Sequence, residues 1–196
     1  LARKALQHGL MRFDENQGYR GPFATIDVSS DWGPALGEVK GLDDVPEWTL
    51  AVVLDATDEG ATVGLMPSRT ESGALSDESS TAKILPENMK WAMSLRIDDK
   101  RQKAKSIADV LKTGDVVHVE KLENGDLRLR QFPAVSGALV SMDPHTGRVL
   151  AMVGGFSYSW QDDIRFYGKA KMTGNFISAS QHFRIREIKT VEVKSD

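Results

Sequence analysis

Two short motifs in the sequence have the residue types and spacing for acyl transfer by a serine. The first lies in Ser79-Ser80-Thr81-Ala82-Lys83, where Ser80 and Lys83 form a Ser-x-x-Lys. On a helix this spacing places the two side chains one turn apart, so that the lysine can accept the hydroxyl proton in a desolvated pocket. The second is Lys112-Thr113-Gly114, a triplet that accompanies Ser-x-x-Lys in one class of serine acyl-transferases.

The surroundings of both motifs disfavour such a site. Ser80 ends the polar loop 68–80, and the strand-like segment 81–86 that follows stops at Pro86. The triplet 112–114 links a helical-looking stretch to a strand, as a glycine turn ordinarily does. No Ser-x-Asn is present, and a separation of about 30 residues leaves no room for the helical domain that such folds insert. A self-contained serine acyl-transferase using Ser80 and Lys83 is therefore the alternative hypothesis, and we expect no catalytic residue here.

The histidines do not form a metal site by their spacing. They are isolated from one another and from carboxylates at ligand spacing, which predicts no zinc site and no metal or other cofactor. One of them alternates within a strand, so we expect it to point outward or to have its hydrogen bonds satisfied. The four are His8, His118, His145 and His182.

The basic segment 96–105 is the strongest candidate for binding nucleic acid. Its cations are interleaved with Asp98 and Asp99, and Trp91 is the only aromatic residue nearby. A single-strand groove needs several stacking rings, so the segment is more typical of a solvated surface. No glycine-rich phosphate loop is present either. An oligonucleotide-binding module is kept as a second alternative, but we expect no nucleic-acid partner.

Composition indicates a soluble domain with a real core. The 196 residues are 40% hydrophobic and 27% charged, with a net charge of −3 and a pI of about 5.9. There is no general electrostatic attraction to nucleic acid or anionic membrane. The chain has no Cys, which excludes disulfides, thiolate metal sites and cysteine nucleophiles. It starts at Leu1 within a helical pattern, so we expect a longer protein with any targeting segment upstream.

Local patterns predict a mainly β fold. A short amphipathic helix is expected over 1–14, followed by a helical turn around 33–39. Short strand-like segments with polar turns between them are typical of a small β-barrel or sandwich. Two hairpins are expected, one with Asn124-Gly125 as a type I′ turn and one with Pro144 and Gly147 in its turn. The predicted strands outside the hairpins cover 48–56, 61–67, 81–86 and 89–94.

The segment 132–159 closely resembles the start of the transpeptidase domain of class A penicillin-binding proteins. It contains Gly-Ala-Leu-Val-x-x-Asp-Pro-x-Thr-Gly-x-Val and Ala-Met-Val-Gly-Gly. Upstream segments agree in order: 3–6 and 18–22 resemble the link that leaves the glycosyltransferase domain. Three further segments resemble the OB-like domain inserted between the two catalytic domains, namely 85–93, 108–119 and 127–140. Together the resemblance covers about four fifths of the chain, residues 1–160.

The resemblance also explains both opening motifs. It assigns Lys112-Thr113-Gly114 to a strand start at which the glycine serves a turn, and it implies that the catalytic triplet lies far downstream. After residue 159 the sequence departs from the family. An ungapped alignment keeps Arg165 and Gly174 in register but places Asn175 at the serine position and Ser178 at the lysine position. Neither residue can supply its chemistry. The tail could be a natural divergence, a cloning or frameshift artefact, or segments joined across gaps.

The resemblance implies a fold, a domain order and a function. The expected fold is a small OB-like β-barrel with a short N-terminal helix and flanking strands. We expect a helix and linker over 1–30, the OB-like domain over 31–134, the first transpeptidase strands over 135–159 and a divergent tail over 160–196. The implied function is a non-catalytic, regulatory or interdomain region of a bacterial peptidoglycan synthase.

The same resemblance implies a location and a set of partners. The synthase is expected at the periplasmic face of the inner membrane, held by an N-terminal anchor that is not in this sequence. The expected partners are the two catalytic domains of the synthase itself and a periplasmic or lipoprotein regulator. Loop 68–80 and segment 96–105 are the candidate contact surfaces for that regulator, an assignment that rests on fold analogy.

Overall fold

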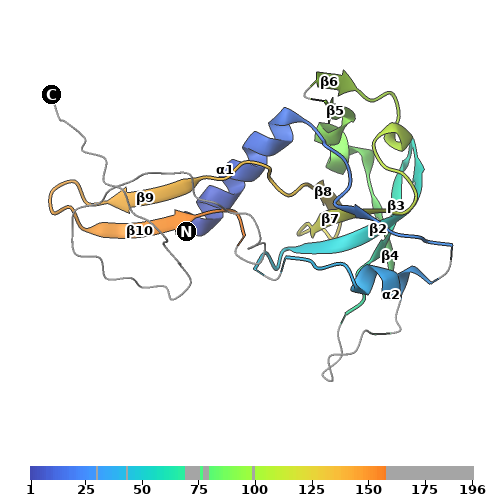
Figure 1. Ribbon diagram of the computed structural model, residues 1–196, viewed down its shortest axis with the longest axis horizontal. Helices are drawn as coiled ribbons and strands as arrows, with labels where there is room; N and C mark the ends of the chain where they lie inside the picture. The colour runs from blue at the N-terminus through green and yellow to red at the C-terminus, as the bar shows by residue number, and fades with distance from the viewer. Residues whose placement is uncertain (30, 43, 69–75, 77–79, 99, 158–196) are drawn as a thin grey trace. The chain divides into compact units, whose positions relative to one another are not determined.

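The computed structural model describes residues 1–29, 31–42, 44–68, 76, 80–98 and 100–157 (Figure 1). The described elements belong to one compact unit, Leu1–Gln161. Most of loop 68–80 and the whole predicted tail 160–196, with Asn175, Ser178 and His182, lie outside the described residues. No helix in the described part of the chain combines the length and the apolar character needed to cross a membrane.

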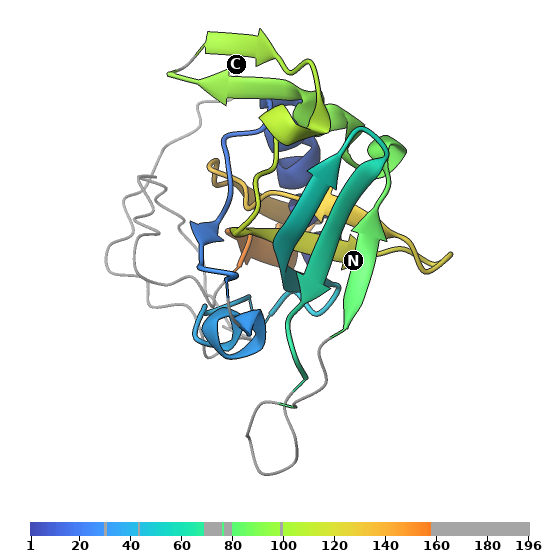
Figure 2. The same ribbon diagram turned by 90° about the vertical axis from the view of Figure 1, so that its right-hand side faces the viewer.

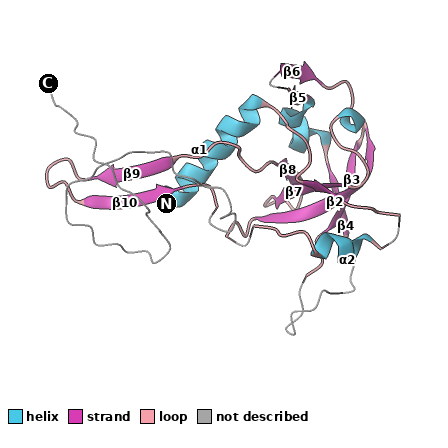
Figure 3. Ribbon diagram, viewed as in Figure 1, coloured by secondary structure: helices cyan, strands magenta, loops and turns pink. Residues whose placement is uncertain are grey.

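A closed five-stranded barrel confirms the predicted OB-like fold (Figure 3). The sheet runs in the order β1-β7-β2-β3-β4-β8, and β7 also pairs with β8, which closes it. The β4–β8 contact is parallel, and the other pairs are antiparallel. The five strands of the ring are β2 (Trp48–Thr57), β3 (Gly60–Leu65), β4 (Thr81–Ile84), β7 (Asp115–Lys121) and β8 (Leu127–Arg130). The short β1 (Ala24–Thr25) pairs with β7 as an additional strand.

Helices and two further hairpins flank the barrel (Figure 1). The hairpins are β5 (Ser94–Ile97) with β6 (Lys100–Lys103), and β9 (Ala138–Met142) with β10 (Val149–Gly154). The helices are α1 (Ala2–Gln17), α2 (Trp32–Gly37) and the 3-10 helices η1 (Pro86–Met93) and η2 (Ile107–Asp109). The N-terminal helix and the turn around 33–39 were predicted from the sequence, and the structure confirms both.

Side-chain alternation on the strands separates two cores. Val53, Val63 and Val119 point into the barrel, where η1 contributes Met89 and the segment after η2 contributes Leu111. On the opposite face Val52 and Val116 pack against Leu36 of α2. Successive residues of a strand face opposite sides of a sheet, so one run of β-branched residues supplies both cores. This double burial explains why 48–56 is apolar almost throughout.

Three local predictions were wrong. Residues 89–94 were predicted as a strand, but 89–93 form the end of η1 and only Ser94 belongs to a strand, β5. Pro86 starts a helical turn, and Met89 and Ala92 share the buried side at the period of three typical of a 3-10 helix. The helical-looking stretch 96–111 instead contains the β5–β6 hairpin and η2. Asp98, with φ 48°, follows β5 directly, in the left-handed conformation that Asp tolerates in tight turns.

The third correction concerns the turn between β7 and β8. The hairpin forms as predicted, but a type I′ turn needs positive φ at both central residues. Here Gly125 has φ 89° while Asn124 stays outside that region. The N–H of Gly125 donates to the carbonyl of Leu122, and the N–H of Leu122 donates to Asp126. The loop is therefore a longer hairpin turn closed by a left-handed glycine.

A glycine, Gly18, connects the end of helix α1 to the barrel, and any other residue there would force the neighbouring backbone to shift. Gly18 has φ 101°, and a Cβ on it would lie 2.6 Å from the carbonyl oxygen of Ser94. Its N–H caps the helix by donating to Glu15. The next residue, Tyr19, forms a parallel bridge with Leu95 of β5. Gly18 thus turns the chain from the helix directly onto the sheet.

Candidate functional site

The structure does not bring Ser80 and Lys83 together as a nucleophile and a base. Ser80 is exposed, and its carbonyl accepts a hydrogen bond from Leu65 just before β4. Lys83 lies on β4, paired with Thr62, and its Nζ is 3.7 Å from a carboxylate oxygen of Glu59. Residues three apart in an extended chain point to opposite faces. The Ser-x-x-Lys spacing brings the two side chains together only on a helix, so on this extended segment it does not form a nucleophile–base pair.

Lys112-Thr113-Gly114 forms a turn, as the sequence predicted. Gly114 has φ 90°, its N–H donates to Val53 at 2.8 Å, and its carbonyl accepts from Ile26 at 2.9 Å. The Asp115 carboxylate accepts from the N–H of Lys112 at 2.8 Å and closes the turn. A Cβ at position 114 would lie 2.6 Å from the Ile26 carbonyl oxygen. The triplet therefore forms the turn that leads into β7, and its backbone hydrogen bonds fix this turn to Ile26, directly after β1, and to Val53 of β2.

His118 is buried, which corrects the prediction of an outward or satisfied residue. Its ring packs between Phe23, 4.6 Å away between centroids, and Trp48, 5.5 Å away. Within the described residues its Nε2 has no hydrogen-bond partner. Burial lowers the pKa of His118 from 6.5 to about 4, so the imidazole is neutral at pH 7. His8 and His145 are exposed, and the described residues hold no cluster of His, Asp or Glu suited to a metal.

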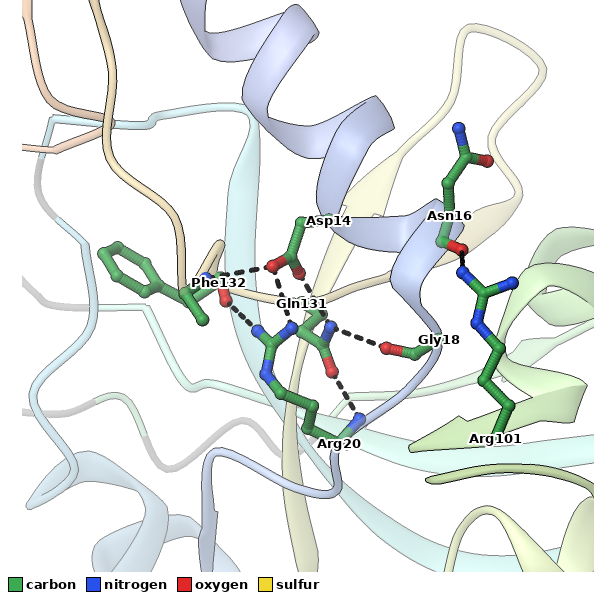
Figure 4. A network of polar contacts seen from close by, with 8 residues as sticks. Asp14, Asn16, Gly18, Arg20, Arg101, Gln131 and Phe132 are labelled. Atoms are coloured by element: carbon green, nitrogen blue, oxygen red, sulfur yellow. Dashed lines mark hydrogen bonds and ion pairs between the residues drawn. The ribbon is translucent and has the colours of Figure 1, made fainter. Parts of the chain in front are cut away.

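The most developed polar site is a buried carboxylate near the end of α1, Asp14 (Figure 4). The Asp14 side chain is 2% exposed. It accepts from the Arg20 guanidinium at 2.8 Å, from Nε2 of Gln131 at 2.8 Å and from the N–H of Ala134 at 3.0 Å. A buried charge is tolerated when it is paired and its remaining lone pairs are hydrogen-bonded, which is the case here.

Arg20 and Gln131 extend this network to both chain segments that meet at the barrel. The Arg20 guanidinium also donates to the carbonyl of Phe132 at 2.8 Å, and the Arg20 N–H donates to Oε1 of Gln131 at 2.8 Å. Nε2 of Gln131 donates to the Gly18 carbonyl at 3.3 Å. The network joins the segment leaving α1 to the segment leaving β8 (Figure 4).

A second carboxylate, Glu15, ties the same helix turn to the barrel wall. It forms an ion pair with Arg130 of β8, whose side chain is 10% exposed. Arg130 also pairs with Glu120 of β7, with 2.6 Å between the closest atoms. Because both strands belong to the closed sheet, the ion pairs fix the last turn of α1 against the barrel itself.

The first half of α1 is held at another carboxylate, Asp44. Its side chain, which is 2% exposed, accepts from Arg3 of α1 and from the hydroxyl of Ser157 beyond β10. Gln7 of α1 donates to the carbonyl of Phe156 at 2.9 Å. Asp44 therefore connects three segments: the helix, the loop before β2 and the end of the β9–β10 hairpin.

Apolar packing fills the space between the two carboxylates. Leu10 of α1, Trp48 of β2 and Phe156 form a buried cluster with Leu42 and Val45. The rings of Trp48 and Phe156 are 5.2 Å apart. We call the residues around Asp14, Asp44 and this cluster the junction. Its charged groups are paired, and their contacts hold three chain segments together.

Sequence reasoning missed Asp14, Asp44 and Gln131 as members of a site. One signal was available: Asp14 and Glu15 lie in the last turns of α1, where the negative end of the helix dipole disfavours acidic side chains. Such a placement indicates that the acids have partners elsewhere. Arg20 and Gln131 fall within 18–22 and 127–140, two of the segments that carry the family resemblance.

A family model for the penicillin-binding protein OB-like domain matches residues 19–135. The chain belongs to this family. The matched range contains the whole closed barrel, with Tyr19 at one end and Gln131 close to the other, so the boundaries of the family domain coincide with the junction.

The chain is similar to curated proteins named penicillin-binding protein 1A. The one from Rickettsia felis is 38% identical over 159 residues, which cover 81% of this chain and 18% of that protein. The one from Pseudomonas aeruginosa is 29% identical over 160 residues, 80% of this chain and 18% of that protein. The chain thus spans about a fifth of the length of these relatives.

A solved structure of a related protein has a similar fold over most of this chain. The crystal structure of penicillin-binding protein 1A from Haemophilus influenzae matches with a TM-score of 0.57 at 26% identity, over 82% of this chain and 21% of that one. The match extends beyond the 19–135 range of the barrel domain, so it includes flanking segments as well as the OB-like fold.

Proposed function

We propose that this chain is the non-catalytic interdomain region of a bacterial peptidoglycan synthase, and that the junction sets the geometry between its neighbours. The whole protein would be a peptidoglycan glycosyltransferase and penicillin-sensitive transpeptidase. The membership in the penicillin-binding protein OB-like family supports this parent role. The observation that carries the interdomain role is the pair of buried carboxylates, Asp14 and Asp44, that bind segments from both ends of the barrel.

The junction is suited to this role because its contacts are specific in geometry. Charged hydrogen bonds have narrow distance and angle requirements, and those of Asp14 come from three different positions along the chain. Helix α1 would continue from a preceding domain, and β10 would lead into a following one. Movement of α1 relative to the barrel would break hydrogen bonds at Asp14 and ion pairs at Glu15 in the same step.

The β9–β10 hairpin supports a following domain. Its two strands pair only with each other among the described residues, and five large apolar side chains on them are exposed. A two-stranded sheet with exposed apolar residues is marginal in water and is stabilised by further strands or a helix. We assign this hairpin to the first strands of a transpeptidase domain. The five side chains are those of Val140, Met142, Val149, Leu150 and Met152.

The location and the regulatory partners follow from the same assignment. The parent protein would face the periplasm from the inner membrane, anchored by a segment outside this chain. Its catalytic domains would be the first partners of this region, and a periplasmic or lipoprotein regulator would be another. The described part of segment 96–105 is exposed on β6 and is the better placed of the two candidate contact surfaces.

A distance measurement tests the interdomain role. The chain has no Cys, so spin labels can be attached at two introduced cysteines, His8→Cys on α1 and Glu123→Cys on the β7–β8 turn, both at exposed positions. Double electron–electron resonance should give one narrow distance distribution. With Asp14→Ala added, the distribution should broaden while circular dichroism still shows a folded barrel.

Two results would count against the proposal. A broad distribution in the chain with Asp14 intact would mean that the junction does not hold α1 in place. An unchanged narrow distribution after Asp14→Ala and Asp44→Ala together would mean that other contacts set the geometry. A label pair within the barrel, Asp58→Cys with Glu123→Cys, provides the control, since neither substitution at the junction should change that distance.

A further inference from the structure

Strand β6 has an outer edge that pairs with no other strand among the described residues, and it is strongly basic. Its four residues are Lys100, Arg101, Gln102 and Lys103, all exposed, in a chain whose net charge is −3. Across the part of the chain that the structure describes, β6 pairs only with β5. Figures 1 and 2 both show β6 as the outer strand, with β5 between it and the barrel. Such an edge offers backbone groups to any compatible strand.

The hydrogen bonds of β5 determine which groups of β6 face outward. The Ser94 carbonyl accepts from the N–H of Tyr19, and the Arg96 N–H donates to the Tyr19 carbonyl, both at 2.7 Å. The peptide groups of Ser94 and Arg96 therefore face Tyr19, and those of Leu95 and Ile97 face β6. In an antiparallel pair the bonded residues alternate. Leu95 pairs with Gln102 and Ile97 with Lys100.

The peptide groups of Arg101 and Lys103 consequently point away from β5. The N–H of Ala104 donates to the Met93 carbonyl at 2.8 Å, which continues the same alternation. Two residues with both N–H and C=O directed outward can make up to four backbone hydrogen bonds to one added strand. This is the geometry by which extended peptides bind to sheet edges.

The side chains of the same two residues place positive charge beside this edge. In the register of the hairpin, Arg101 lies opposite Arg96 and Lys103 lies opposite Ser94. These side chains share the face opposite to Leu95, which packs on the barrel core. Arg101 and Lys103 therefore place two cationic side chains on one face beside the outer edge, and these attract an anionic ligand.

Charge decides what can occupy the edge. Lysines on an edge strand normally prevent pairing with other strands, and here they would repel a second copy of β6. They attract a strand that carries carboxylates. A single-stranded nucleic acid is less suitable, because it needs aromatic rings free for stacking. The rings of Trp91 and Tyr19 pack against each other, and Trp91 donates its Nε1–H to the carbonyl of Leu129.

We propose that β6 is a binding site for an extended acidic peptide, which adds as a strand to its outer edge and places carboxylates on the Arg96, Arg101 and Lys103 face. The occupant would be a glutamate- or aspartate-rich segment of a partner protein. The inference rests on the partner role proposed above. Its test measures peptide binding, so either outcome leaves the interdomain test by distance measurement unaffected.

Fluorescence anisotropy with a labelled peptide of about ten residues, alternating Glu and Thr, tests the site. At low salt the peptide should bind, and Arg101→Glu with Lys103→Glu should weaken binding at least about ten-fold. Arg101 also donates to the Asn16 carbonyl, so Lys103→Glu alone is measured as a variant that spares that contact. The matched control is Lys121→Glu with Arg148→Glu, which has the same charge change at exposed positions elsewhere and should leave affinity within about two-fold.

A second peptide separates strand addition from attraction of charges alone. The same sequence with N-methyl groups on alternate residues keeps every carboxylate but loses the donors along one edge, so it should bind much more weakly. Equal affinity of the methylated peptide would overturn strand addition. Absence of binding by the unmodified peptide, or equal loss in the control variant and the β6 variants, would overturn the site.

Discussion

Gln131 donates a hydrogen bond from Nε2 to Oδ2 of Asp14 at 2.8 Å, across 117 positions of the chain. The two residues lie at opposite ends of the barrel in sequence, one in α1 and the other directly after β8. Their contact closes the domain as a loop whose ends are fixed to each other. The end of α1 is thereby fixed to the chain segment that leaves β8.

Asp14→Ala should lower the free energy of unfolding by about 3 kcal/mol. The substitution leaves the Arg20 guanidinium and the Gln131 amide without their acceptor in a largely buried site, and that loss is larger than the cost of a missing surface pair. Urea denaturation followed by tryptophan fluorescence measures the change. Asp58→Ala, at an exposed position, is the control and should shift stability by less than about 0.5 kcal/mol. Equal effects of the two substitutions would contradict the prediction.

Acid should destabilise the chain partly through His118. Burial lowers its pKa from 6.5 to about 4 in the folded state. Between these values the unfolded chain binds a proton that the folded chain does not, so stability falls as the pH drops through this window. The full shift corresponds to a loss of about 3 kcal/mol, reached near pH 4. Well above pH 6.5, where the histidine is deprotonated in both states, it contributes no pH dependence.

His118→Phe isolates this contribution. Phenylalanine keeps a ring between Phe23 and Trp48 but cannot be protonated, so the variant should lose less stability than the parent chain between pH 7 and pH 4.5. Urea unfolding at the two pH values gives the comparison, and the carboxylates titrate in both proteins alike. Identical pH dependence in both would show that His118 is not buried in its neutral form.

Local patterns predicted several strands and a small β-barrel or sandwich, and the family resemblance selected the OB-like barrel. β2, β7 and β8 have the alternation and β-branched residues that define them, and Gly125 marks their turn. The junction depends instead on contacts such as Arg20 with Phe132, 112 positions apart, which no local pattern encodes. β5 was missed for a similar reason: it is stabilised by Tyr19, which is remote in sequence. Only the acidic residues in the last turns of α1 gave a local indication of these contacts.

Gly114→Ala should destabilise the chain more than Gly125→Ala. Both glycines have nearly the same positive φ, 90° and 89°, so the backbone cost of adding a Cβ is similar, about 1 kcal/mol. At position 114 the Cβ would also lie 2.6 Å from the Ile26 carbonyl oxygen, whereas nothing lies within 4 Å at position 125. The expected losses are about 1 kcal/mol for Gly125→Ala and more than about 2 kcal/mol for Gly114→Ala. Thermal or urea denaturation of the two variants distinguishes them, and equal losses would mean that the turn before β7 can move away from β1.

A fluorescent penicillin should not label this chain covalently. Acylation needs a serine whose hydroxyl lies beside a base, and Ser80 and Lys83 lie in extended chain, where residues three apart face opposite sides. Lys83 forms an ion pair with Glu59 instead. The triplet 112–114 forms the turn before β7 and does not lie beside Ser80 as a catalytic strand would. Gel fluorescence after incubation at neutral pH is the measurement, with a full-length class A penicillin-binding protein labelled in parallel. Stoichiometric labelling that disappears in Ser80→Ala would establish the acyl-transferase alternative and overturn the non-catalytic assignment.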